Sequence, residues 1–215
     1  MIRFVRHAES TANAGGVTME HAAIPLSELG RAQAALLAEV LLADMQPELV
    51  LTSKYLRAIE TARPFCEATG CQPEVHPLLH EFSTLDATFL QGMTGAQRRP
   101  IAESYWRQAD PGFRHGPRAE TFLEFEARVS GFMAHLPTLP DHTVLFGHGI
   151  WFGLLCWKLL GFSALDAQGM QAFRRFQTAL PVPNGAVYTL EQTSFGRWHL
   201  QADERLMRRM ASCMA

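Results

Sequence analysis

The sequence has few cysteines and none of the compositional signs of disorder. Its four cysteines form neither a C-x-x-C pair nor the regular spacing of a disulfide framework; they are Cys66, Cys71, Cys156 and Cys213. A reducing, cytoplasmic compartment is therefore expected. With 47% hydrophobic and 19% charged residues in a chain of 215, the composition excludes an intrinsically disordered protein.

The sequence also has no excess of positive charge. Its 19 Lys and Arg residues stand against 21 Asp and Glu residues, for a formal net charge of −2. This balance excludes a broadly basic nucleic-acid-binding surface, and we expect no nucleic-acid partner. Any affinity for an anion has to come from a local cluster of cations.

Long apolar runs are scarce, and the one stretch with the length of a membrane span is interrupted. In residues 144–162, Gly147-His148-Gly149 breaks the apolar pattern and Lys158 lies inside it. Because a charge at mid-bilayer is costly, we interpret the stretch as a buried strand, a glycine turn and a core helix. The N-terminus shows no apolar segment followed by a cleavage site, so we expect neither a signal peptide nor membrane association.

Strand and helix patterns alternate along most of the chain. No repeat or linker divides it, so we expect a single domain over residues 1–215. Compact apolar runs predict strands at 2–5, 49–51, 74–76, 143–146, 186–190 and 197–200. Amphipathic patterns predict helices at 27–43, 54–69, 96–108, 121–135 and 150–160. This alternation favours an α/β three-layer sandwich, with helices on both faces of a mostly parallel central sheet.

Local signals refine this outline. Ser27 and Ser53 are placed to cap helices, and Gly70 to end one. Glycine and proline punctuate residues 78–118, which we interpret as a partial cap inserted over the domain. Residues 197–200 are predicted to form an edge strand, which is compatible with a homodimer.

Three predicted strands end in a charged or glycine-containing turn. Arg6-His7 follow the first strand, Arg57 follows the second and His148 follows a later one. Open α/β sheets bind ligands beyond the carboxyl ends of their strands, so neighbouring parallel strands would bring these side chains together. Two arginines and two histidines suit a small anionic ligand, and a phosphate ester is the natural expectation.

Short motifs are distributed over residues 2–190. The first is Arg6-His7-Ala8-Glu9-Ser10-Thr11-Ala12-Asn13, and others lie at 52–62, 79–81, 119–129, 147–149 and 184–185. In this order they resemble the blocks of the histidine phosphatase superfamily, which includes cofactor-dependent phosphoglycerate mutases. The family's first block reads Arg-His-Gly-x-Ser-x-x-Asn, so Ala8 stands where glycine is usual. The resemblance implies a phosphoglycerate-mutase-like fold.

The resemblance also implies a mechanism. His7 would attack phosphorus and form a phosphohistidine. Arg6, Arg57 and His148 would hold the phosphoryl oxygens, where charge develops during transfer. Glu81 would protonate the leaving alcohol and then activate water.

Other residues have supporting roles in this comparison. Glu120 is the next candidate acid after Glu81. No metal ion or cofactor is implied. The further substrate-binding candidates are Ser10, Asn13, Gly149 and Asn184.

Within the family, the sequence favours a hydrolase that acts on a small phosphorylated metabolite. Residues 82–86, which follow Glu81, do not resemble the glycine-rich stretch found there in mutases. A phosphoglycerate-type phosphomutase is the alternative. A binding module of the same fold with little turnover is another, because of Ala8.

Two interpretations lie outside the family. Gly147-His148-Gly149 opens a helix after a strand, as in a dinucleotide site with Asp166 as the ribose ligand, although the glycine spacing differs from the usual one. His76 and His80, among nine histidines, suggest zinc, although Pro77 disfavours a helix that would place both rings on one face.

Overall fold

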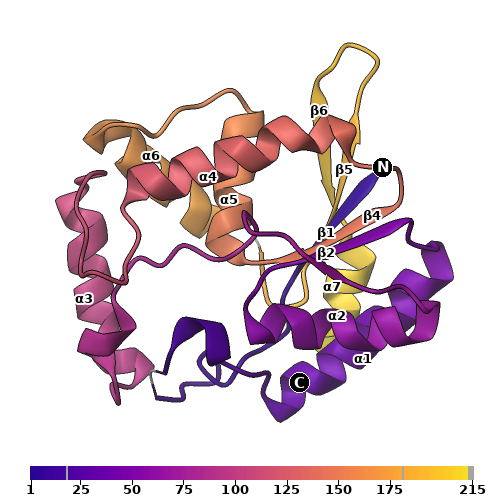
Figure 1. Ribbon diagram of the computed structural model, residues 1–215, viewed down its shortest axis with the longest axis horizontal. Helices are drawn as coiled ribbons and strands as arrows, with labels where there is room; N and C mark the ends of the chain where they lie inside the picture. Colours follow the sequence, from indigo (N-terminus) through magenta and orange to yellow (C-terminus); the bar gives the residue numbers. More distant parts are fainter. Residues whose placement is uncertain (18, 181, 213–215) are drawn as a thin grey trace.

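A six-stranded sheet lies at the centre of the computed structural model, which describes residues 1–17, 19–180 and 182–212 (Figure 1). Cys213 lies outside these residues. The strand order is β3-β2-β4-β1-β5-β6; β3, β2, β4 and β1 are parallel, and β5 and β6 are antiparallel to their neighbours. The strands are β1 (Ile2–Arg6), β2 (Leu49–Thr52), β3 (Glu74–Val75), β4 (Thr143–Gly147), β5 (Val187–Gln192) and β6 (Trp198–Ala202).

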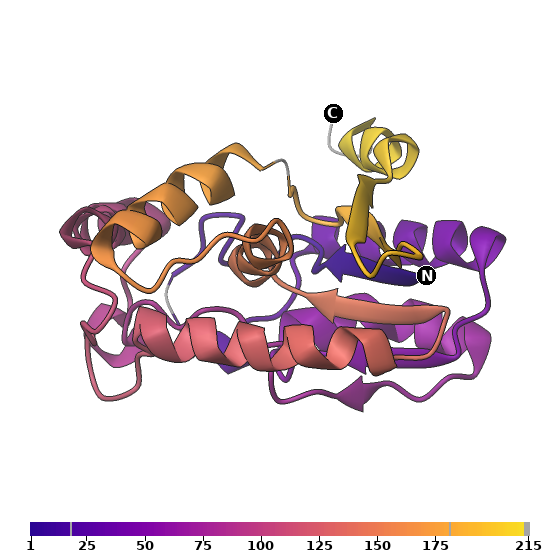
Figure 2. The ribbon, with the colours of Figure 1, turned by 90° about the horizontal axis from the view of Figure 1, so that it is seen from above.

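Helices cover both faces of this sheet (Figures 1 and 2). The α/β class with a mostly parallel sheet is therefore confirmed. The helices are α1 (Glu28–Asp44), α2 (Leu56–Thr69), α3 (Gly95–Gln108), α4 (Phe122–His135), α5 (Gly149–Leu159), α6 (Ala167–Ala179) and α7 (Glu204–Ser212). Short 3-10 turns lie at His21–Ala23, Ala87–Leu90 and Leu136–Thr138.

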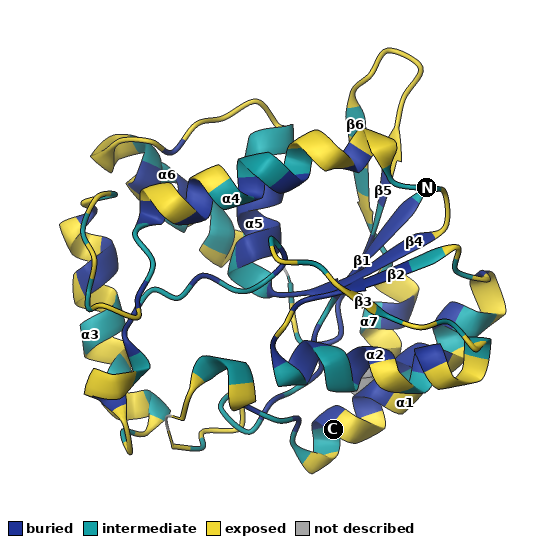
Figure 3. Ribbon diagram, in the orientation of Figure 1, coloured by how far each residue is buried: buried dark blue, intermediate teal, exposed yellow. Residues whose placement is uncertain are grey.

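The two-residue period of the strands separates two cores. Val5, Val50 and Val144 point to one face, where they pack with residues of α1, α2 and α7. Their chain neighbours point to the other face, into a larger aromatic core with α4 and α5. Figure 3 shows β1, β2 and β4 buried between these layers, whereas β3 and β6, at the edges of the sheet, are more exposed. A central strand buried on both faces explains why these segments read as continuous apolar runs rather than as alternating patterns.

The helix ends follow the expected local chemistry with one exception. Ser27 is the N-cap of α1 and accepts a hydrogen bond from the Gly30 N–H, and Gly70 ends α2 with φ of 72°. The prediction that Ser53 caps α2 is wrong. That helix begins at Leu56 without a side-chain cap.

Helices α6 and α7 were not predicted. Asp166 is the N-cap of α6 and accepts from the Gly169 N–H, which is a recognisable start signal. The segment 144–162 is β4, a glycine turn and α5, as predicted. No helix in the described part of the chain combines the length and the apolar character needed to cross a bilayer.

Residues 78–118 run from the sheet out to α3 and back (Figure 1). One carboxylate joins the two arms of this excursion: Asp86 accepts hydrogen bonds from the backbone N–H groups of Thr88 and Arg118, both at 2.8–2.9 Å. A Cβ at Gly116 would lie 2.7 Å from the Asp86 side chain, so the arms approach closely. The division of the chain into one domain with a cap insertion stays a prediction.

Two helical glycines should respond in opposite ways to alanine. A Cβ at Gly30 in α1 would lie 1.9 Å from the Glu9 carbonyl oxygen, whereas at Gly131 in α4 its nearest neighbour is a Leu78 methyl at 3.5 Å. We expect Gly30→Ala to lower the free energy of unfolding by about 1–3 kcal/mol. The matched Gly131→Ala should raise it by about 0.5–1 kcal/mol. Urea unfolding measures both, and a stabilised Gly30→Ala would contradict the close approach.

Candidate active site

The carboxyl ends of β1, β4 and β2 lie level at one edge of the sheet. Arg6 is paired in register with Gly147, and Thr52 with Phe146. The ladder continues one residue further, since the His7 N–H donates to the Gly147 carbonyl at 2.9 Å. The residues that follow the three strands are therefore brought to the same place, as the sequence predicted.

His7 is the centre of this cluster, and its ring is buried. Its Nδ1 lies 2.7 Å from the Ala8 carbonyl oxygen, and its Nε2 lies 3.2 Å from the Nε of Arg57. Since a carbonyl only accepts and a guanidinium only donates, Nδ1 carries the proton and Nε2 presents its lone pair. Burial, then Arg57 and Arg6, hold the pKa of His7 well below its ordinary value. The geometry thus presents a neutral imidazole whose nucleophilic nitrogen, Nε2, accepts a hydrogen bond from Arg57.

His148 faces His7, with the two ring centroids 5.1 Å apart. Its Nε2 lies 2.8 Å from Ser53 Oγ, and this nitrogen is the acceptor that the described hydrogen bonds offer the Ser53 hydroxyl proton, since Oγ accepts from the Tyr55 N–H. The proton of His148 then belongs on Nδ1, a buried atom that has no partner. Burial, followed by Arg57, lowers the pKa of His148 well below its ordinary value.

Two arginines supply positive charge from either side. Arg57 donates to the His21 carbonyl at 2.8 Å, and Arg6 donates to the carbonyl of Val182. Burial lowers the pKa of both guanidinium groups, and Glu81 opposes this shift. The Nε of Arg6 is buried without a partner. Gly149 makes room for this group, since a Cβ there would lie 3.3 Å from that nitrogen.

The unpartnered nitrogens of Arg6 and His148 are the clearest sign of a ligand site. Buried polar groups are nearly always hydrogen-bonded, and an unmade bond costs about 1–3 kcal/mol. Both are donors here, next to a third donor, Arg57. An anion with several oxygen atoms would satisfy them together.

Glu81 lies at the N-terminus of α5. Its carboxylate accepts three backbone N–H bonds: from Phe82 at 2.9 Å, Ile150 at 3.0 Å and Trp151 at 2.9 Å. A helix N-terminus favours an anion, so this position suits a carboxylate. The structure therefore places the predicted acid beside the turn that carries His148.

The segment leading to Glu81 is held by Arg128 of α4. Its guanidinium donates to the carbonyls of Leu78 at 3.0 Å and His80 at 2.7 Å. It also forms a two-point pair with Glu120, at 2.9 and 2.8 Å. The second candidate acid, Glu120, is thus committed to this pair, whereas Glu81 contacts the turn of the site.

Ser10, Asn13 and Asn184 brace the loop after β1. Asn184 Nδ2 donates to the His7 carbonyl at 3.0 Å, and the Ser10 hydroxyl donates to Asn13 Oδ1 at 2.8 Å. These contacts fix the backbone that carries His7. Their predicted contact with substrate stays a prediction. Ala8, the departure from the family pattern, belongs to a small buried apolar cluster with Leu26 and Ala34.

Ser53 and Tyr55 are site residues that the sequence patterns did not indicate as such. Ser53 was read as a helix cap, but it orients His148 instead. The Tyr55 ring lies against His148, with centroids 5.2 Å apart, and under the Arg57 guanidinium at 4.9 Å. An aromatic residue at the start of a helix gives no signal of this kind, because one of its partners, His148, is distant in the chain.

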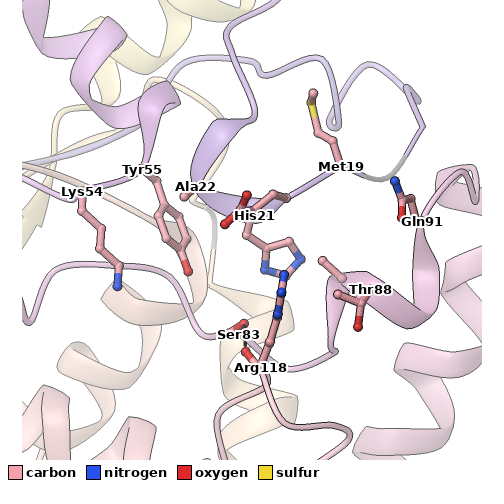
Figure 4. Close-up of a pocket in the computed structure, with 11 residues that line it drawn as sticks. Met19, His21, Ala22, Lys54, Tyr55, Ser83, Thr88, Gln91 and Arg118 are labelled. Carbon is pink, nitrogen blue, oxygen red and sulfur yellow. Dashed lines mark hydrogen bonds between the residues drawn. The ribbon is translucent and has the colours of Figure 1, made fainter.

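A hollow of about 410 Å³ adjoins this cluster, with Tyr55 in its wall (Figure 4). It lies between the turn at 19–22, the turn at 54–55 and the two arms of the 78–118 excursion. Its size is that of a metabolite pocket. Arg6, His7, Arg57 and His148 do not line it; Tyr55, whose ring contacts His148 and Arg57, connects the hollow to the cluster.

The two interpretations from outside the family do not match this geometry. Asp166 caps α6 and does not follow a strand, and Glu81 already takes the α5 amides that a pyrophosphate would need. The His76 ring packs against Phe132, with centroids 5.0 Å apart, and His80 bonds the Pro77 carbonyl. Among the described residues, no three His, Cys, Asp or Glu side chains are grouped for a metal ion.

The His7 tautomer can be tested directly. Because burial and two arginines disfavour its charged form, we expect His7 to remain neutral at about pH 5.5, with the proton on Nδ1, where an ordinary histidine is mostly charged. Nitrogen NMR of histidine-labelled protein distinguishes the two ring nitrogens. The urea-unfolded chain is the control and should titrate near pH 6.5. A proton on Nε2 in the folded protein would contradict the assignment.

Comparison with known proteins agrees with this site. The model of the histidine phosphatase superfamily (branch 1) matches residues 2–203. The chain is 35% identical over 135 residues to a glucosyl-3-phosphoglycerate phosphatase of Mycobacterium tuberculosis, covering 61% of this chain. The aligned part spans 58% of that relative's length. An adenosylcobalamin/alpha-ribazole phosphatase of Salmonella typhi is 31% identical over 178 residues, covering 79% of this chain and 83% of the relative.

Solved structures give the same result for the fold. The mycobacterial glucosyl-3-phosphoglycerate phosphatase superposes with a TM-score of 0.68 at 28% identity, covering 94% of this chain and 96% of that one. A putative alpha-ribazole-5'-P phosphatase from Escherichia coli gives 0.72 at 25% identity, with 94% of each chain covered. The resemblance predicted from the motifs is confirmed: the chain belongs to branch 1 of the histidine phosphatase superfamily.

Proposed function

We propose that the protein hydrolyses a phosphoric monoester of a small metabolite through a phosphohistidine on Nε2 of His7. The observation that carries this proposal is the Nε2 lone pair beside Arg57, with the unpartnered nitrogens of Arg6 and His148 nearby. A nucleophile and three oxygen-binding donors are what phosphoryl transfer requires. The names of the relatives, two kinds of phosphatase among them, support the same reaction class.

In the first step, the lone pair on Nε2 attacks phosphorus and the ester oxygen leaves. Arg6, Arg57 and His148 donate to the phosphoryl oxygens, whose charge is greatest in the transition state. The Ala8 carbonyl, which accepts from Nδ1, stabilises the imidazolium character that develops on His7. Two guanidinium groups supply the positive charge, so we propose no metal ion and no cofactor.

Glu81 is the proposed acid and base. It would give a proton to the leaving oxygen, and as carboxylate it would then take one from the water that attacks the phosphohistidine. Its three backbone N–H bonds suit the carboxylate form that the second step needs. Glu120 is paired with Arg128 and is the weaker candidate.

Hydrolysis is proposed in preference to mutase activity. A mutase has to shield the phosphohistidine from water and return the phosphoryl group to the bound alcohol. Probable phosphoglycerate mutases are among the relatives, one from Photorhabdus laumondii at 28% identity over 171 residues. Faster isomerisation of a phosphoglycerate than release of phosphate would favour that alternative.

The remaining proposals concern the cellular location and the binding partners of the protein. Within the part of the chain that the structure describes, the cysteines Cys66, Cys71 and Cys156 are free, which supports a reducing, cytoplasmic location. The proposed partner is a small phosphorylated substrate, with neither nucleic acid nor membrane. Strand β6 is at the edge of the sheet, where it is available for a homodimer.

Trapping the intermediate tests the reaction. After a brief reaction with a labelled phosphoester and an alkaline quench, we expect acid-labile, alkali-stable label on His7, because a phosphoramidate survives alkali and not acid. Peptide mapping locates the label. His7→Ala should abolish both label and turnover. Turnover that continues without label on His7 would sink the mechanism.

The role of Glu81 is tested by the leaving group. Glu81→Gln should slow an alkyl phosphate about 100-fold or more, and p-nitrophenyl phosphate much less, since nitrophenolate leaves with little help from an acid. The ratio of the two kcat/KM values is the readout. Glu120→Gln is the matched control and should leave that ratio unchanged. Equal losses on both esters in Glu81→Gln would show that Glu81 is not the general acid.

A further inference from the structure

Polar and charged side chains line part of the hollow beside the catalytic cluster. A second, shallower hollow adjoins it, and four residues line both: Lys54, Tyr55, Ser83 and Arg118. Figure 4 shows Lys54 and Tyr55 coming from the turn after β2, and Arg118 extending toward His21 from the opposite arm of the 78–118 excursion. Four polar side chains from three segments therefore line the place where the two hollows join.

The shared wall carries two cations, Lys54 and Arg118, and the Asp86 carboxylate interacts electrostatically with Arg118. The other charged residues of the second hollow are paired: Arg114 with Glu124, and Glu120 with Arg128. Neither Lys54 nor Arg118 takes part in an ion pair among the described residues. Glu20, an exposed residue, is the acidic side chain on the described lining of the first hollow.

The titratable groups next to these two cations add no positive charge of their own. Burial, then Arg57 and Arg98, lower the pKa of His21 to about 4, so its ring is neutral at physiological pH. Burial raises the pKa of Tyr55 to about 12, which keeps its hydroxyl protonated and able to donate. Asp86 is buried and accepts three hydrogen bonds from Thr88 and Arg118, so its carboxylate is already engaged.

The backbone that carries Arg118 is fixed before any ligand arrives. Its N–H donates to Asp86 at 2.8 Å, and its carbonyl accepts from the Ser83 hydroxyl at 3.5 Å. The Glu120 N–H donates to the Ser83 carbonyl at 2.9 Å. Only the side chain of Arg118 remains to be ordered, which reduces the entropic cost of binding through it.

We propose that Lys54 and Arg118 bind a second acidic group, a carboxylate or another phosphate, on the alcohol part of the substrate. The inference rests on the proposed function, because the phosphoryl group must occupy the His7 cluster for the alcohol to enter this hollow. The hydroxyl of Tyr55, which keeps its proton, is available to donate to the same group. The preferred substrates are thus phosphomonoesters that carry a second negative charge, rather than neutral or cationic ones.

Two esters of equal carbon number test this selectivity. 3-Phosphoglycerate carries a carboxylate where glycerol 3-phosphate carries a neutral hydroxymethyl group, and the ratio of their kcat/KM values isolates the second charge. We expect the unaltered protein to prefer 3-phosphoglycerate. Lys54→Gln and Arg118→Gln should each reduce the ratio about tenfold, the effect of losing one partly exposed charged hydrogen bond.

Control variants separate charge from structure. Arg107→Gln removes an exposed cation from the last turn of α3, away from both hollows, and should leave the ratio unchanged. Lys54→Arg and Arg118→Lys keep the charge and should retain most of the preference. If a glutamine variant does not fold, as judged by its melting temperature, the same kcat/KM ratio is measured for Lys54→Glu or Arg118→Glu. A reversed charge should make glycerol 3-phosphate the preferred ester.

The outcomes distinguish the two proposals. Hydrolysis of both esters with equal kcat/KM, or a ratio that is the same in the glutamine variants, would overturn the second binding group and leave the phosphatase proposal intact. Failure of the unaltered protein to hydrolyse either ester or p-nitrophenyl phosphate would overturn the proposed function, and the second binding group with it.

Discussion

The register between three parallel strands is the constraint on which the site depends. Strands β1, β2 and β4 end level, and a backbone hydrogen bond from His7 to Gly147 extends the pairing beyond the strands. A slip of one residue would move every side chain to the opposite face. The apolar layers on both faces prevent that slip, so the same burial that stabilises the sheet also fixes the distance between His7 and His148.

The negative charge that opposes the positive charge of the two arginines comes from a loop residue outside these strands, Glu81. Glu81 reaches the cluster from the start of the 78–118 excursion and opposes the burial-induced lowering of the pKa of Arg6 and Arg57. It is held there at both ends: by the amides of α5 and, through the chain before it, by Arg128. The site is therefore assembled from two sources, a rigid sheet edge for the phosphoryl group and a pinned loop for the carboxylate.

Sequence patterns predicted the parts of the structure whose causes are local. Apolar strands followed by Arg6-His7 and His148, and caps such as Ser27, are determined by neighbours in the chain, and they lie as predicted. Ser53 was misread because its partner, the His148 ring, is 95 positions away. The helix α6 was missed although Asp166, its N-cap, is a local start signal. What Glu81 contacts likewise depends on α5, which no local pattern reveals.

The hydrogen bonds of Arg57 have a consequence for turnover. Its Nε already donates to His7, and another nitrogen already donates to the His21 carbonyl. The lone pair of His7 can attack phosphorus only after the Arg57 Nε–H releases it, so this N–H exchanges His7 for a phosphoryl oxygen. The N–H groups of the guanidinium that have no internal acceptor bind without such an exchange. Such an exchange yields less net affinity than binding to a free guanidinium. When inorganic phosphate departs, the Arg57 Nε–H regains its hydrogen bond to His7, which favours release of the product.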